Sequence, residues 1–144
     1  MNKNPFVGTW KLITCQFRSA EGPIDSPYGP DPLGRISYDA SGNMAVQILR
    51  ADRPRFASDD RYNGTPEEVR AAFEGSLAYF GRYEVDADAG TVTHHVVACT
   101  FPNWIGRHQK RHYVFSGNRL TLRTPPMLMG GAMITGELVW ERIP

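Results

Sequence analysis

The stretch that decides the fold is YFGRYEVDADAGTVTHHVVAC, residues 79–99. Two runs within it, 79–86 and 91–99, are rich in aromatic and β-branched residues, which favour extended strands. The tetrapeptide ADAG lies between them and supplies turn residues of the kind that join antiparallel strands. The stretch therefore predicts a β-hairpin.

The same pattern recurs on both sides of this hairpin. Short turn segments, Ala-Ser-Gly and Ser-Gly-Asn, separate two further pairs of strand-like runs. The remaining predicted strands are 7–17, 34–39, 43–50, 107–115, 119–124 and 134–142. Eight antiparallel strands with tight turns predict an up-and-down barrel, because closure removes exposed sheet edges and encloses room for one small ligand. A two-sheet sandwich could use the same strands.

One helix interrupts the strands. Thr65 is suited to be its N-cap, Pro66 its first residue and Glu68 the second half of a capping box. The predicted helix runs from about 66 to 77 and docks onto the sheet by an apolar face made of Val69, Phe73, Leu77 and Phe80.

Composition indicates one ordinary globular domain over residues 1–144, with 16 Lys and Arg against 15 Asp and Glu. A net charge of +1 gives no electrostatic reason to expect a nucleic acid or a membrane surface as partner. The first twelve residues lack signal-peptide features, so a cytoplasmic location is expected. Cys15 and Cys99 show no metal or redox spacing and are expected to be buried free thiols.

The two ends of the chain carry a pattern that resembles lipocalins and the wider calycin group. Gly8-Thr9-Trp10 opens the first strand, and Arg142 ends the last. The resemblance implies that Trp10 plugs the closed end of a barrel and that Arg142 packs across its indole. A guanidinium over an indole face is a favourable cation–π contact.

A closer resemblance covers nearly the whole chain. It is similar to the lipocalin-like domain family of small bacterial and fungal proteins, in the segments YGPDPLGRISYDASGNMAVQILRADRPRFA, LAYFGRYEVD, TVTHHV, FPNWIG and NRLTL. The resemblance implies the barrel fold, but no single reaction defines the family. Function must therefore be argued from the candidate site.

Adjacent strand residues point to opposite faces, so only one of His94 and His95 can face the interior. Hydrophobicity slightly favours the face with Val92, His94 and Val96 as the inward one. Hydrophobicity is a weak criterion here, because the interior of a ligand-binding barrel is partly polar.

The next strand offers an inward set with Gln109, Arg111 and Tyr113. A buried Arg111 needs an acceptor, which Glu84, Glu137 or an oxygen anion of a ligand could supply.

Other candidates come from the strand 79–86 and from two loops. Tyr79 and Tyr83 share one face and could orient or protonate a bound oxygen, or could simply fill the core. Trp104, in the corner FPNWIG, could form the ligand rim, or it could pack there as a structural residue. Met129 lies in the segment PPMLMGGAM, which could act as an adaptable flap over an apolar ligand or pack against the end of the barrel.

These residues support a slight preference for a cofactor-free acid/base enzyme of the isomerase or lyase type. Its substrate would be a small apolar or aromatic molecule that carries oxygen. The hypothesis assigns catalysis to His94, His95, Arg111 and Tyr83, and ligand binding to Tyr79, Gln109, Trp104, Tyr113 and Met129.

A non-catalytic carrier with the same ligand is the main alternative. A haem or metal site that pairs one of these histidines with His108 or His112 is weaker, because no third ligand stands at a matching spacing. The sequence therefore predicts neither a metal nor another cofactor, and it leaves monomer and homodimer open.

Overall fold

The structure is a computed structural model that describes residues 4–144. Residues 1–3, which begin the segment without signal-peptide features, lie outside the described residues. Within residues 4–144, no helix has the length and apolar character needed to cross a bilayer. The elements in chain order are β1 (Gly8–Ser19), β2 (Gly22–Ile24), β3 (Leu33–Tyr38), β4 (Asn43–Leu49), α1 (Pro66–Glu74), β5 (Ser76–Asp86), β6 (Thr91–Cys99), the 3-10 helix η1 (Pro102–Trp104), β7 (His108–Ser116), β8 (Arg119–Arg123), β9 (Met127–Met129) and β10 (Ala132–Arg142).

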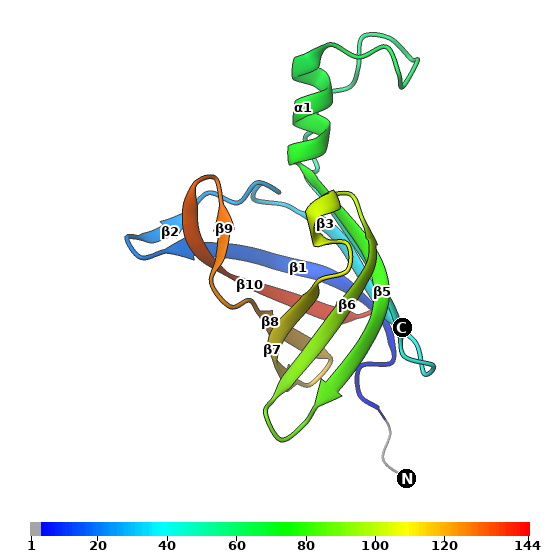
Figure 1. Ribbon diagram of the computed structural model, residues 1–144, viewed down its shortest axis with the longest axis vertical. Coiled ribbons are helices and arrows are strands. Elements are labelled where there is room, and N and C mark those ends of the chain that lie inside the picture. Colours follow the sequence, from blue (N-terminus) through cyan, green and yellow to red (C-terminus); the bar gives the residue numbers. More distant parts are fainter. Residues whose placement is uncertain (1–3) are drawn as a thin grey trace.

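Eight of the strands close into an antiparallel barrel (Figure 1). Neighbours in sequence pair from β3 to β8, β10 follows β8, and pairing of β1 with both β3 and β10 completes the circle. The barrel prediction is confirmed, and all eight predicted strands are present. Two short strands were not predicted: β2 pairs with β1 and β9 pairs with β10, and both extend the sheet beyond the barrel.

One end of the barrel is sealed by the residues that the lipocalin resemblance implied. The indole Nε1 of Trp10 donates to the carbonyl of Phe6 at 2.9 Å. The guanidinium of Arg142 lies 4.2 Å from the centre of the indole ring and donates to the carbonyls of Val7 and Pro5, each at 2.7 Å. These contacts join the first and last strands and confirm the expected roles of Trp10 and Arg142.

The helix begins as predicted but does not dock onto the sheet. Thr65 and Glu68 form the capping box, with the Thr65 side chain accepting from the Glu68 backbone N–H. However, Val69 is 50% exposed and Phe73 48% exposed, and α1 projects away from the barrel in Figure 1. The predicted docking face is therefore wrong.

The cause is where the helix ends. Gly75 follows the last helical residue, and Ser76 already begins β5. Leu77 and Phe80 therefore belong to a strand, and Phe80 points outward. The two apolar residues that remain on α1 offer too little surface to hold a helix against a sheet.

Gly81 permits the close approach of β5 and β6. A β-carbon at this position would collide with the backbone carbonyl oxygen of His95. The register between the strands shifts between Phe80 and Gly81, where the pairing is irregular. This irregularity lies on the two strands that carry Tyr79 and His94.

Candidate ligand-binding cavity

A cavity of about 570 Å³ occupies the barrel on the side opposite the Trp10 seal. Most of its wall is apolar and comes from inward-facing strand residues, including Ile36, Val46, Ile48, Leu122 and Leu138. Strand alternation explains this lining, since Val46 and Ile48 are buried whereas their neighbours Ala45 and Gln47 are exposed. The volume is in the range of sites that bind small organic molecules.

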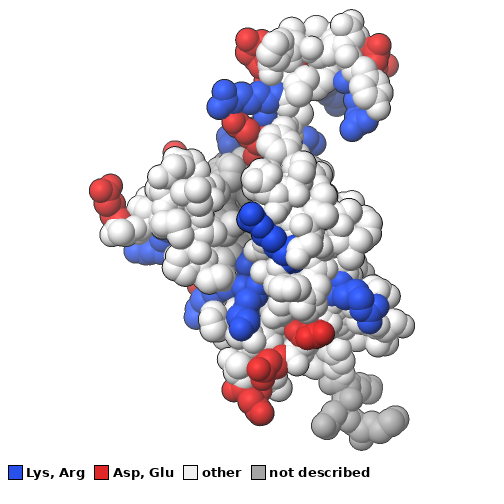
Figure 2. Space-filling model, in the orientation of Figure 1, with Lys and Arg blue, Asp and Glu red and all other residues white. Residues whose placement is uncertain are grey.

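On the face shown in Figure 2, Lys and Arg lie in several groups across the middle and upper parts of the molecule, and Asp and Glu lie in smaller groups near the upper and lower ends and at the left edge. The distribution agrees with the near-zero net charge.

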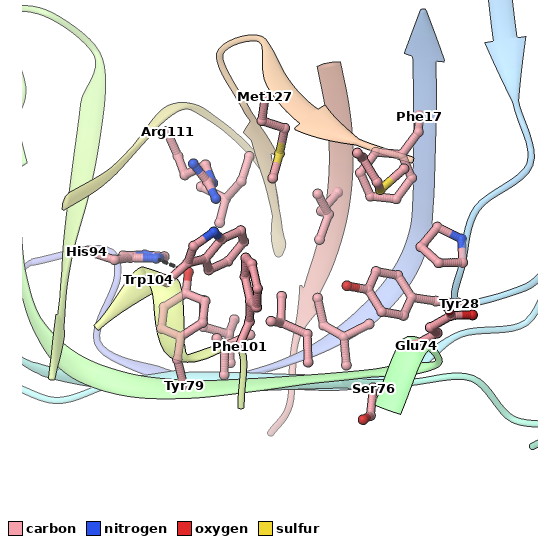
Figure 3. Close-up of a pocket in the computed structure, with 18 of the residues that line it drawn as sticks. Phe17, Tyr28, Glu74, Ser76, Tyr79, His94, Phe101, Trp104, Arg111 and Met127 are labelled. Atoms are coloured by element: carbon pink, nitrogen blue, oxygen red, sulfur yellow. Dashed lines mark hydrogen bonds between the residues drawn. The ribbon is translucent and has the colours of Figure 1, made fainter. Parts of the chain in front are cut away.

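His94 is the buried polar centre at one end of the cavity (Figure 3). It is 1% exposed, and its Nε2 lies 2.7 Å from the Tyr38 hydroxyl, while its Nδ1 lies 2.7 Å from the Tyr79 hydroxyl. Burial, helped by the positive charge of Arg111, lowers the pKa of His94 from 6.5 to about 3. The imidazole is therefore neutral near pH 7, and both of its nitrogens are engaged.

The two tyrosines are held in the protonated form. Burial raises the pKa of Tyr79 to about 12, although Arg111 opposes the rise. Burial also raises the pKa of Tyr38 well above its ordinary value. Both phenols are hydrogen-bond donors and acceptors at neutral pH, not anions.

Arg111, on β7, lines the same end of the cavity and is 8% exposed. Its Nη1 donates to the Lys110 carbonyl at 3.0 Å, and its Nη2 donates to Gln109 Oε1 at 3.4 Å. Within residues 4–144 it forms no ion pair. The expected protein acceptors are elsewhere: Glu84 lies beside His95, and Glu137 binds Arg123 at 2.8 Å.

His95 faces away from the cavity. Its Nδ1 lies 2.5 Å from Nδ1 of His108, and its Nε2 lies 3.6 Å from the Glu84 carboxylate. The choice that the sequence left nearly open is thus decided by the structure: His94 points inward, and His95 joins a histidine pair on the outside. No cluster of three or more His, Cys, Asp or Glu that could hold a metal ion occurs in the described part of the chain.

Three other predicted residues do not line the cavity. Tyr83 lies toward the sealed end, where its hydroxyl donates to the Asp39 carbonyl at 2.6 Å and accepts from Asn4 at 2.9 Å. Tyr113 packs edge-on against Phe6, with ring centres 4.9 Å apart. Gln109 supports Arg111 through the hydrogen bond described above.

Trp104 and Met129 do line the cavity. Trp104 is the last residue of η1, and its ring stands edge-on to Tyr79 with centres 6.0 Å apart. Met127, Met129 and Gly130 bring the β9 hairpin to the cavity wall.

Sequence reasoning missed Tyr38, Tyr28 and a role for Trp140. Tyr38 follows Ile36 by two residues in a predicted strand, so alternation could have placed it inside. Trp140 lines the cavity, and its buried Nε1 has no hydrogen-bond partner within residues 4–144. Nothing in the local pattern marks Tyr28, which lies in a long loop. In Figure 3 Tyr28 lines the far side of the cavity from His94.

The two cysteines are free, as expected. Cys15 is buried, which raises its pKa to about 12. Cys99 is only partly buried, so for this residue the expectation holds in part. Neither thiol lines the cavity.

Comparison with known proteins gives a consistent result. The sequence pattern of the family described as "Lipocalin-like domain" matches residues 7–143. The 4'-hydroxy-3'-methoxypropiophenone carrier protein ppsC of Aspergillus oryzae (strain ATCC 42149 / RIB 40) is 33% identical over 108 residues, which span 70% of this chain and 97% of that protein. No solved structure matches the chain significantly. With the closed barrel and its sealed end, these matches show that the chain belongs to the lipocalin-like domain family.

Proposed function

We propose that the protein is a carrier that encloses one small aromatic molecule with a ketone or phenol oxygen. The observation that carries this proposal is the state of His94, whose two nitrogens are both hydrogen-bonded to tyrosine hydroxyls. A general base must reach the proton that it removes. The neutral, fully engaged imidazole of His94 is a fixed part of the wall, which favours carriage over the catalysis preferred from sequence.

The rest of the cavity supports the same proposal. Its wall is mostly apolar and aromatic, with His94, Tyr79 and Arg111 at one end and Tyr28, Glu74 and Ser76 at the other. A flat apolar body with an oxygen that reaches the end with His94, Tyr79 and Arg111 would match this lining. The printed name of the Aspergillus oryzae relative describes a carrier of an aryl ketone of this kind.

Calorimetric titration with 4'-hydroxy-3'-methoxypropiophenone tests the proposal. We expect saturable binding with one ligand per chain. Ile48→Trp should reduce affinity by about tenfold or more, because Ile48 is buried in the cavity wall and the larger ring would fill the ligand space. Gln47→Trp is the matched control, since the neighbouring residue is exposed on the outer face of β4. Equal losses in both variants, or no binding by the wild type, would contradict the proposal.

Catalysis remains a second candidate because the Tyr79 hydroxyl lines the cavity and is linked through His94 to Tyr38. Such a chain beside Arg111 could move a proton to or from a carbonyl compound, as an isomerase, cyclase or dehydratase requires. Deuterium exchange at the carbon next to the ketone, followed by NMR, separates the two functions. Exchange above the buffer rate that disappears in Tyr79→Phe would establish an enzyme, whereas binding without exchange supports a carrier.

A further inference from the structure

The hydrogen-bond chain Tyr38–His94–Tyr79 has a direction that the surroundings determine. A neutral imidazole has one N–H and one acceptor nitrogen, so one tyrosine donates to His94 and the other accepts from it. Tyr38 is almost fully buried, and His94 is its hydroxyl's only hydrogen-bond partner within residues 4–144. If Tyr38 accepted, its own O–H would be left buried without an acceptor, which is unfavourable.

Tyr38 therefore donates to Nε2, and His94 carries its proton on Nδ1 and donates to the oxygen of Tyr79. This arrangement leaves the Tyr79 O–H free, and Tyr79 lines the cavity. The buried chain thus acts as a positioning device: it turns the Tyr79 hydroxyl into a donor that is available to a ligand.

Arg111 supplies a second donor at the same end. It is more than nine-tenths buried, forms no ion pair within residues 4–144, and uses only part of its five N–H donors in the two hydrogen bonds described above. A buried cation without a counter-charge is costly, and an anion in the cavity would offset that cost. Figure 3 shows Arg111, His94 and Tyr79 at one end of the cavity.

We propose that Arg111 and the Tyr79 hydroxyl bind one negatively charged oxygen of the ligand, so that the cavity selects the ionised form of a weak oxygen acid. The ligand class is a flat apolar molecule with a phenolate, enolate or carboxylate. This inference rests on the proposed carrier function and adds the charge state and the binding groups of its ligand.

Few other titratable side chains of the cavity could bind or repel an anionic oxygen beside Arg111. The remaining titratable residues of the cavity wall, apart from His94 and Tyr79, are Tyr28 and Glu74. Both are on the far side of the cavity from Arg111 in Figure 3, and Glu74 binds Arg70 at 2.8 Å. The cavity residues from β8, β9 and β10 carry no titratable side chain, and Lys110 and His112, next to Arg111 on β7, are exposed.

The test uses the absorption of 4'-hydroxy-3'-methoxypropiophenone, whose phenolate is conjugated with the ketone and absorbs at longer wavelength than the phenol. A pH titration of the bound probe should show ionisation at least about one pH unit lower than in buffer, which is a tenfold preference for the anion. The methyl ether, 3',4'-dimethoxypropiophenone, cannot ionise and should bind about tenfold or more weakly above the ionisation midpoint.

Variants assign the effect to the two donors. Arg111→Gln should remove most of the preference, about 10- to 100-fold, and Tyr79→Phe should reduce it while keeping the cation. Lys110→Gln is the matched control, because it removes the same charge from an exposed position on the same strand. Thermal unfolding of each variant verifies that it is folded. If Arg111→Gln does not fold, the Tyr79→Phe result decides.

A second pair of probes distinguishes the source of the anion. Binding of 3,4-dimethoxybenzoate but not its methyl ester would assign a carboxylate and would also support the inference. Equal binding of the phenol and its methyl ether, with no shift in ionisation and no preference for the benzoate, would overturn the inference and leave the carrier function intact. Failure of every probe to bind would overturn both.

The nitrogen of His94 that carries the proton can be identified by a separate measurement. Nitrogen-15 NMR of the imidazole should show His94 protonated on Nδ1 in the unliganded protein. Protonation on Nε2 would mean that Tyr79 donates to His94, and it would overturn the assignment of Tyr79 as a free donor.

Discussion

Lowering the pH from about 7.5 to about 5 should destabilise the folded protein through His94. The pKa of this residue is lowered to about 3 in the folded state, against an ordinary value of 6.5 that the unfolded chain should regain. As the pH falls below about 6.5, His94 therefore becomes protonated in the unfolded chain while it stays neutral in the folded chain. The stability contributed by His94 is fully present above about pH 6.5 and is lost progressively as the pH falls towards about 3.

The magnitude follows from the two pKa values. Each pH unit in this window costs up to about 1.4 kcal/mol, so the free energy of unfolding should fall by about 2 kcal/mol between pH 7.5 and pH 5. For a chain of this size that is a fall in Tm of roughly 6 °C. The surface carboxylates with lowered pKa, Asp39, Asp52 and Glu68, have ordinary values of 3.8 to 4.5, so their contributions are lost mainly below this window.

Urea unfolding at a series of pH values measures the effect, with His94→Gln as the test variant. Glutamine can donate and accept a hydrogen bond but does not titrate. The free energy of unfolding of His94→Gln should therefore fall by about 2 kcal/mol less than that of the wild type between pH 7.5 and pH 5. His112→Gln, which removes an exposed histidine, should keep the wild-type slope. Parallel curves for wild type and His94→Gln would refute the reasoning.

Three further predictions concern the fold. Gly81→Ala should lower the free energy of unfolding by about 3 kcal/mol or more in urea titrations, because its methyl group meets the His95 carbonyl; a loss below about 1 kcal/mol would contradict this. Arg142→Met should cost about 2 kcal/mol, since it removes the cation–π contact with Trp10 and two hydrogen bonds to backbone carbonyls; an unchanged Tm would show that the seal does not depend on the guanidinium. Phe73→Ser should cost no more than about 1 kcal/mol in the same assay, because Phe73 is half-exposed and only the last turn of α1 reaches the cavity wall, and a larger loss would mean that α1 does pack on the barrel.

Local sequence determined the strands and the capped start of the helix. Alternation along 43–50 and 91–99, turn residues between the strands and the Thr65–Glu68 capping box all act over a few residues, so they can be read without the fold. The contact between Trp10 and Arg142, at opposite ends of the chain, could be predicted only from the resemblance to lipocalins. Alternation also restricted His94 and His95 to opposite faces.

The site itself was decided by tertiary structure. Which histidine faces inward, which tyrosines hold it and whether a carboxylate reaches Arg111 depend on the register of β3, β5, β6 and β7 around a closed barrel. Tyr38 and His94 are 56 residues apart and meet only because the barrel curves one wall towards the other. The helix was misjudged for the same reason, because whether an apolar face is buried depends on where the chain leads after Gly75. A strand pattern encodes which side of a sheet a residue occupies, whereas the partners that it meets across the interior depend on long-range closure.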